Sequence, residues 1–316
     1  MPFDQLLGND ALKSRLASEA KQGRLSHCYL LAGPEGSGKR TLARLVAAAA
    51  QCEGDTPPCG VCLPCRKVLA EVHPDVSIVD DASHKQLPAE LIRTARAGVF
   101  IRPNEGRRKV LIFPRAQDMN ATGQNALLKL LEEPPSYAMF LLLADAAEKL
   151  LPTIRSRCAE LRLSPLPDGL LRAELARRFP DAPPDRIGAA LAGAGGFLGR
   201  AAAMLEAEPL PQTPQFAKAY GKGDTLGLLS LFCSMEKFNR DRLLPIVQEF
   251  RRLIVEALLF RQGAAAASPD AMAVAARRTP QALLAAAGAL EEAAADCRAN
   301  VNTATICAAL FARLRL

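Results

Sequence analysis

The sequence predicts an α/β domain built on a parallel sheet, followed by two all-α domains. Short, continuously apolar segments alternate with helical patterns through the first half of the chain. This alternation is typical of a parallel sheet with helices on both faces. A glycine-rich segment joins the first apolar strand to a helix, and no convincing strand pattern follows residue 170. The predicted domains are 1–165, 166–208 and 209–316.

The elements of the first domain follow in order. An amphipathic helix is expected over 11–23. Strands are expected at 27–33, 75–80, 109–113, 138–144 and 159–163. The helices between them are expected at 39–51, 88–100 and 121–133. Prolines and a glycine interrupt both periodicities in "SPLPDG" (164–169), which indicates a linker.

Two helical blocks are expected after this linker. Residues 170–208 contain short helices separated by proline- and glycine-containing segments, and the prolines of 208–214 indicate a second boundary. In the last block, apolar residues recur at the spacing of one helical face. These residues are Leu243, Val247, Phe250, Ile254, Ala257 and Leu258.

Composition restricts the class of protein. The chain has 316 residues, 49% of them hydrophobic, which is enough for more than one core. No uncharged apolar run reaches the roughly 18 residues of a membrane-spanning helix. The start of the chain lacks the pattern of a secretory signal, so we expect a cytoplasmic protein. The net charge of +7 is compatible with work near nucleic acid but does not establish DNA binding.

The segment "GPEGSGKRT" resembles a phosphate-binding loop with one residue displaced. Such loops have Gly, four residues, Gly-Lys and then Ser or Thr, whose hydroxyl binds magnesium. Here Arg40 occupies the hydroxyl position, and Thr41 is rotated away by about 100° on a helix. We therefore expect a degenerate loop without tight ATP binding. Its candidate nucleotide contacts are Gly33, Gly36, Gly38, Lys39 and Thr41.

The strand at 109–113 ends without the acids that an ATPase needs. ATPases with such loops hold magnesium through an acid at this position, but the chain has Pro114 and Arg115. A guanidinium stays protonated and cannot act as a base. Asp118 is expected in the following turn. We therefore expect negligible hydrolysis; the main alternative is an active ATPase with Asp118 or Asp145 as a substitute metal ligand.

Four cysteines with the spacing C-x6-C-x2-C-x2-C predict a metal site in a module at 50–68. They are Cys52, Cys59, Cys62 and Cys65. Four soft ligands suit a closed, structural zinc site, and an iron–sulfur cluster is the chief competitor. The remaining cysteines are expected in the core: Cys28, Cys158, Cys233, Cys297 and Cys307. A zinc-dependent DNA-binding regulator is a further alternative, but residues 50–70 are nearly neutral and lack aromatic side chains.

Several segments together closely resemble the delta-prime family of bacterial DNA polymerase III clamp-loader subunits. They are "FDQLLGNDALKSRLASEAKQGRLSHCYLLAGPEGSGK", the cysteine insertion followed by "HPD", "NALLKLLEEPP", "LLPTIRSRC" and "RANVNTATICAALFARL". The resemblance covers essentially the whole chain. It implies an AAA+-like module of the P-loop type with a zinc insertion, a small helical lid and a helical collar.

The resemblance also implies a role and a set of partners. Five subunits, including tau/gamma and delta, would form a ring that opens the sliding clamp and loads it onto primed DNA, within the DNA-directed DNA polymerase III holoenzyme. The family's serine–arginine–cysteine motif falls on Ser156, Arg157 and Cys158. Arg157 would reach the ATP of a neighbouring tau/gamma subunit as an arginine finger.

Departures from the ATPase members favour the non-hydrolysing delta-prime role over that of a tau/gamma motor. They are Arg40, Pro114, Arg115 and the pair Ala144-Asp145, where a polar sensor is expected. Arg200 lies near the position of a second phosphate-sensing arginine in ATPase relatives.

Overall fold

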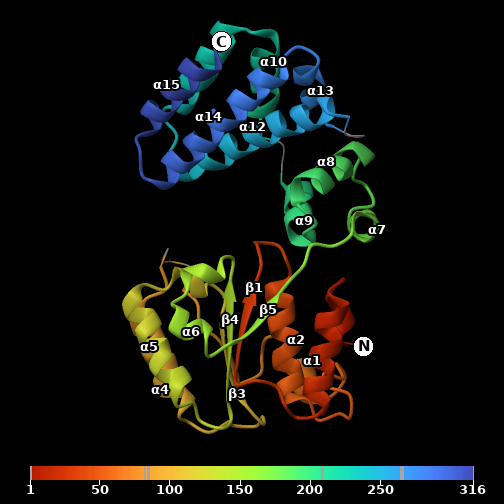
Figure 1. Ribbon diagram of the computed structural model, residues 1–316, viewed down its shortest axis with the longest axis vertical. Helices are drawn as coiled ribbons and strands as arrows, with labels where there is room; N and C mark the ends of the chain where they lie inside the picture. Colours follow the sequence, from red (N-terminus) through yellow and green to blue (C-terminus); the bar gives the residue numbers. More distant parts are fainter. Residues whose placement is uncertain (1, 82, 84–85, 208–209, 264–266, 316) are drawn as a thin grey trace. The chain divides into compact units, whose positions relative to one another are not determined.

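The computed structural model describes residues 2–81, 83, 86–207, 210–263 and 267–315. The chain forms two compact units (Figure 1). The first comprises Met1–Pro167 with Phe197–Arg200, and the second comprises Asp168–Gly196 with Ala201–Leu316. The division into three domains remains a prediction, and its boundary at 208/209 lies outside the described residues.

A five-stranded sheet with the order β2-β3-β4-β1-β5 forms the centre of the first unit. All neighbouring strands run parallel, which confirms the predicted parallel α/β fold. The strands are β1 (Cys28–Ala32), β2 (Val76–Ile78), β3 (Lys109–Phe113), β4 (Ala138–Ala144) and β5 (Ala159–Arg162). Every residue of β1 and β4 is buried, which explains their continuously apolar sequences.

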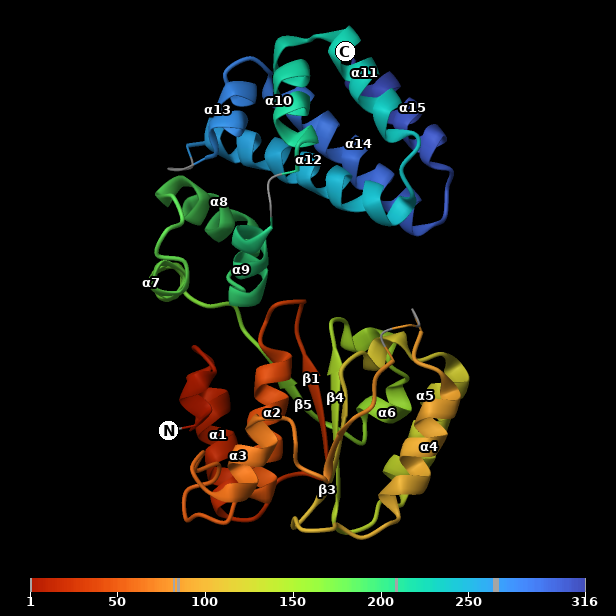
Figure 2. The same ribbon diagram turned by 180° about the vertical axis from the view of Figure 1, so that it is seen from behind.

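Helices cover both faces of the sheet (Figures 1 and 2). One layer contains α1 (Asp10–Lys21), α2 (Lys39–Gln51) and α3 (Leu63–Leu69). The other contains α4 (Ala89–Val99), α5 (Ala121–Glu132) and α6 (Pro152–Arg155). Single turns of 3-10 helix occur at η1 (Pro2–Gln5), η2 (Ala116–Asp118) and η3 (Ala147–Lys149). Tyr29 and Leu31 of β1 join one core, whereas Cys28 and Leu30 join the other, as side-chain alternation requires.

Asp75, from the "HPD" segment, fixes the loop that leads into β3. Its carboxylate is fully buried and accepts hydrogen bonds from the amides of Asn104, Glu105 and Gly106 at 2.7, 2.9 and 2.8 Å. Burial alone would raise the pKa of Asp75, but these amides and Lys109 lower it overall. The carboxylate therefore acts as a structural anchor for this loop.

The described residues of the second unit form helices and no strand, as predicted. The helices are α7 (Asp168–Arg178), α8 (Pro184–Ala194), α9 (Leu198–Glu206), α10 (Gln212–Lys222), α11 (Thr225–Met235), α12 (Arg240–Arg261), α13 (Pro269–Ala275), α14 (Pro280–Arg298) and α15 (Thr303–Leu314). The first residues of α9, up to Arg200, belong to the first unit. The side chains of Asn239, Ser268 and Thr279 cap α12, α13 and α14 by accepting from backbone amides. Within the described ranges, no helix is long and apolar enough to cross a membrane.

The apolar stripe predicted for the last block is confirmed in α12. Leu243, Val247 and Phe250 are fully buried, and the Phe250 ring stacks on Phe216 of α10 with centroids 4.1 Å apart. The expectation that every cysteine outside the metal cluster is a core residue is wrong for Cys233. Cys233 is exposed because it lies off the buried face of α11.

Candidate functional site

The glycine-rich loop joins β1 to α2, where a phosphate-binding loop requires it. Gly36 and Gly38 have φ angles of 77° and 97°, which glycine adopts without strain. The amide of Gly33 donates to the carbonyl of Ala144 at 3.2 Å, which ties the loop to the end of β4. Arg40 points to solvent, and Thr41 is half-buried one position further along α2.

The amino group of Lys39 is held by three oxygen atoms of its own chain. It donates to the carbonyls of Gly33 and Pro34 at 2.6 and 2.9 Å, and to Asp145 Oδ1 at 2.6 Å. An ammonium has three protons to donate, so these bonds use all of them. A phosphate would have to compete with these acceptors for the lysine.

Backbone from a distant part of the sequence packs against the same loop. The amide of Gly199 donates to the carbonyl of Gly36 at 2.9 Å. A Cβ added to Gly36 would lie 2.3 Å from the backbone nitrogen of Arg200, so only glycine fits there. Arg200 therefore approaches the loop through its backbone, and its side chain is exposed.

A guanidinium occupies the end of β3. Arg115 Nη2 lies 2.7 Å from Asp80 Oδ1, and its Nε donates to the same oxygen at 2.9 Å. Asp118 Oδ2 is 3.9 Å from Arg115 Nη1. Burial raises the pKa of Asp118, and Arg115 opposes this shift. As expected, Asp118 lies in a turn, whereas Asn120 caps α5 by accepting from the amide of Gly123.

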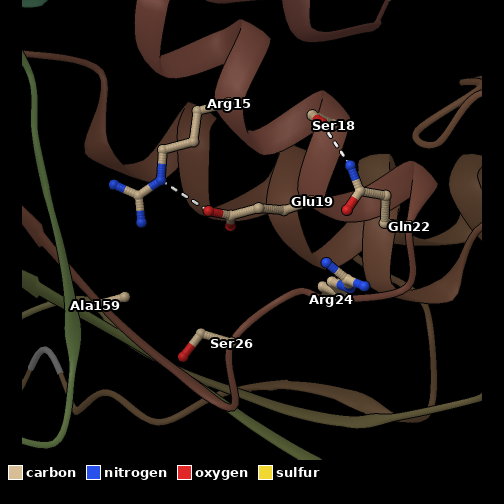
Figure 3. A pocket seen from close by; sticks show the side chains of 7 residues that line it. All are labelled: Arg15, Ser18, Glu19, Gln22, Arg24, Ser26 and Ala159. Atoms are coloured by element: carbon tan, nitrogen blue, oxygen red, sulfur yellow. Dashed lines mark hydrogen bonds and ion pairs between the residues drawn. The ribbon is translucent and has the colours of Figure 1, made fainter.

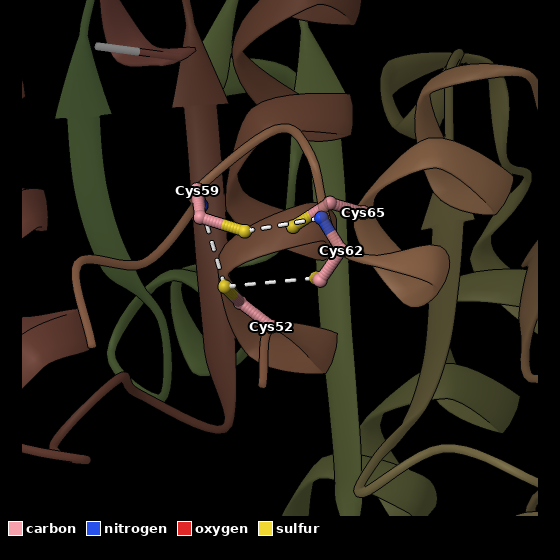
Figure 4. Close-up of side chains that lie close together, drawn as sticks. All are labelled: Cys52, Cys59, Cys62 and Cys65. Atoms are coloured by element: carbon pink, nitrogen blue, oxygen red, sulfur yellow. Dashed lines mark hydrogen bonds between the residues drawn. The ribbon is translucent and has the colours of Figure 1, made fainter. Parts of the chain in front are cut away.

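The four clustered cysteines converge between α2 and α3 (Figure 4). Their sulfur atoms all lie within 4.8 Å of one another, and those of Cys52 and Cys62 are 4.0 Å apart. Sulfur ligands about 2.3 Å from a tetrahedral zinc ion would be roughly 3.8 Å apart, so the group could hold a metal ion. In the part of the chain that the structure describes, no other group of cysteine, histidine and acidic side chains meets this geometry.

Backbone amides around the cluster favour thiolates. The amides of Gly54 and Cys59 approach Cys52 Sγ at 3.3 Å, and the amide of Cys62 approaches Cys59 Sγ at the same distance. The amides of Cys62 and Val61 lower the pKa of Cys59 to about 6. Burial raises the pKa of Cys52 and Cys65, a cost that a bound cation would offset.

Arg157 lies in the turn between α6 and the edge strand β5. Its Nη2 is 3.1 Å from Glu132 Oε1 at the end of α5, and its Nη1 donates to the carbonyl of Thr153 at 3.0 Å. The Ser156 hydroxyl donates to the same carbonyl at 3.0 Å. The Arg157 side chain is 37% exposed, so it can meet a ligand outside this chain. Cys158 contacts Cys28 of β1.

A cavity of about 450 Å³ lies elsewhere, near the amino-terminal ends of β1 and β5 (Figure 3). It is lined by Arg15, Ser18, Glu19, Gln22, Arg24, Ser26 and Ala159. Arg15 donates to Glu19 at 2.7 Å and is therefore already paired. The glycine-rich loop follows the opposite, carboxyl end of β1, so this cavity is not part of the phosphate-loop region.

The partners of the candidate residues were not anticipated from the sequence. The sequence suggests Asp145 as a substitute metal ligand and places it where a polar sensor is expected, but gives no sign that it pairs with Lys39. Asp80 as the partner of Arg115, and Glu132 as the partner of Arg157, were also missed. Lys39 comes after β1 and Asp145 comes directly after β4, so the adjacency of these two strands brings the residues together. No local sequence pattern indicates this adjacency.

The parallel sheet, with a glycine-rich loop after β1, defines an AAA+-like module of the P-loop type. The chain belongs to the family described as DNA polymerase III, delta subunit, whose model matches residues 8–167. This membership confirms the resemblance to clamp-loader subunits.

The relatives include both delta' and gamma/tau subunits. The chain is 37% identical over 190 residues to the DNA polymerase III subunit delta' of Pseudomonas aeruginosa, covering 59% of this chain and 57% of the relative. It is 36% identical over 179 residues to the subunit gamma/tau of Mycobacterium tuberculosis, covering 55% and 31%. The matched region thus spans less than two thirds of either relative.

A solved structure supports the fold. The chain aligns with a DNA polymerase III gamma subunit-related protein from Thermotoga maritima at a TM-score of 0.50 and 17% identity, covering 95% of this chain and 98% of that chain.

Proposed function

We propose that this chain is the delta-prime subunit of a bacterial DNA polymerase III clamp loader and does not hydrolyse ATP itself. It would work in the cytoplasm with tau/gamma and delta subunits to load a sliding clamp onto primed DNA. One observation carries this proposal: cationic side chains in the phosphate-loop region are paired with carboxylates of the same chain. Lys39 is bound to Asp145, and Arg115 is bound to Asp80.

Hydrolysis needs a magnesium ligand at the end of β3 and a group that orients water. Pro114 offers no side-chain oxygen, and Arg115 brings a positive charge to a position where a cation would have to bind. The hydroxyl expected after the lysine is replaced by Arg40. Each missing contact weakens stabilisation of the transition state, and together they favour a scaffold over a motor.

Arg157 would act on a neighbouring subunit. A guanidinium on an exposed turn can stabilise charge on phosphates that another subunit holds, a contribution of roughly 10³–10⁵ in rate in other systems. The guanidinium of Arg157 donates hydrogen bonds to Glu132 and Thr153, and part of the Arg157 side chain remains accessible to solvent. Ser156 and Cys158 would shape the turn that presents it.

The cysteine module would hold structural zinc. Four thiol ligands from one chain leave no open position for a substrate. Zinc would tie the end of α2 to the start of α3, because Cys52 follows α2 and Cys65 lies in α3. The metal would therefore stabilise the fold rather than take part in catalysis.

An active ATPase of the tau/gamma type is the alternative, because the chain keeps Lys39 and is similar to gamma/tau relatives. Hydrolysis by the isolated, zinc-loaded chain with magnesium separates the two. We expect turnover at background level and co-purification with the tau/gamma and delta subunits. Turnover comparable to that of an isolated motor subunit would refute it.

A further inference from the structure

Two cysteines outside the metal cluster form a pair across adjacent strands. Cys28 begins β1, and Cys158 directly precedes β5. The parallel register pairs Tyr29 with Ala159, so one step back brings Cys28 opposite Cys158. Neighbouring strands are about 4.8 Å apart, within the 4.4–6.8 Å Cα separation typical of disulfides.

The side chains agree with this register. Cys28 Sγ and Cys158 Sγ are 2.8 Å apart, although the residues are 130 positions apart in sequence. A disulfide has sulfur atoms about 2.05 Å apart, so an approach of about 0.8 Å would suffice. Cys28 is fully buried and Cys158 is half-buried, so an oxidant reaches Cys158 first.

We propose that Cys28 and Cys158 are a redox modification site at which a peroxide forms a reversible disulfide. The Cys158 thiol reduces hydrogen peroxide, giving a sulfenic acid and one water. The Cys28 thiol then attacks that sulfur, which forms the S–S bond and releases a second water. A dithiol reductant returns both thiols by exchange.

The disulfide would change the conformation of the turn that contains Arg157. In the reduced chain this turn is closed by backbone bonds, from Ser156 N to Pro152 O and from Arg157 N to Ile154 O. β5 is an edge strand that pairs only with β1 among the described strands. A covalent bond at Cys158 would shift and fix the base of this turn. This regulatory effect rests on the proposed function, whereas disulfide formation does not.

The chemical test uses the full-length, zinc-loaded chain treated with hydrogen peroxide, followed by alkylation and mass spectrometry of non-reduced peptides. We expect a cross-linked peptide containing residues 28 and 158 that dithiothreitol abolishes. Cys233→Ala, which removes an exposed thiol, should form the same cross-link. In Cys28→Ala the sulfenic acid at Cys158 has no partner, and dimedone should trap it. Cys28→Val serves as a second variant if the alanine variant does not fold.

The proposal would be overturned if no cross-link forms in the wild type and dimedone labels Cys158 there to the same yield as in Cys28→Ala. For the regulatory effect, oxidised and reduced chains are assembled into the loader and DNA-stimulated ATPase is measured. A displacement near 1 Å at a catalytic group can cost about 10²-fold, so we expect a reversible fall of up to about 10²-fold at the affected site. A cross-link without any fall would refute the regulatory effect alone. A reduced loader indifferent to Arg157→Ala would instead refute the proposed function.

Discussion

The Lys39–Asp145 ion pair makes a quantitative prediction about nucleotide affinity. In Asp145→Asn the amide keeps the shape of the side chain but loses the charge that holds Lys39. At 2.6 Å, a Coulomb energy with an effective dielectric constant of 20 would be about 6 kcal/mol. The Asp145 side chain is 48% exposed, so solvent screening reduces the net value to about 1–2 kcal/mol.

A phosphate that binds Lys39 no longer has to displace this carboxylate in the variant. We therefore expect ADP, titrated without magnesium, to bind roughly 5- to 30-fold more tightly to Asp145→Asn than to the wild type. Isothermal titration calorimetry measures the change directly. Hydrolysis should stay at background level, because Pro114 and Arg115 still provide no metal ligand.

Two control variants separate the ion pair from the general loss of a negative charge. Glu148→Gln removes the same charge from a nearby exposed position in η3, and should leave affinity unchanged. Combining Lys39→Ala with Asp145→Asn should abolish the gain. If ADP binds Asp145→Asn within about twofold of its affinity for the wild type, or if the gain survives without Lys39, the ion pair does not limit nucleotide binding.

The remaining predictions concern stability. The proposed zinc site is tested by treating the chain with a chelator, or by replacing Cys62 with Ser; either should lower the melting temperature and increase proteolysis near residues 52–65. Unchanged melting would contradict a structural metal. Asp75→Asn should destabilise the chain by about 3 kcal/mol at neutral pH, measured by urea unfolding, because three amides lose a charged acceptor. The pKa of Asp75 is lowered in the fold, so its stabilisation is present above the unfolded value near 3.9 and is lost as pH falls through the folded value. The difference between wild type and Asp75→Asn should accordingly shrink in acid; a constant difference would contradict this role.

Strands β1, β3 and β4 could be predicted from sequence because they are buried along nearly their whole length, which makes their sequences continuously apolar. The expected bounds of β3, β4 and α2 coincide with the observed ones. The short helix α3 was missed because prolines and glycines dominate the cysteine segment. Pro64 near its start is the one signal that favours a helix there, since proline suits the first helical turn.

Partners in the candidate site could not be predicted in the same way. Which carboxylate meets Lys39, and which thiol meets Cys158, depends on strand order and register. Cys28 lies in an apolar segment, from which we expect only that it packs in the core. Its position opposite Cys158 follows from the pairing of β1 with β5. Local patterns identify the residues; tertiary pairing determines what they can do.

The most direct test of the central claim compares two variants in one assay, the DNA-stimulated ATPase of a loader reconstituted with tau/gamma and delta subunits. Lys39→Ala removes the lysine of the chain's own phosphate loop, and Arg157→Ala removes the arginine that we propose acts on a neighbouring subunit. We expect full activity with Lys39→Ala and loss of one site's turnover with Arg157→Ala. Loss with Lys39→Ala and normal turnover with Arg157→Ala would contradict it.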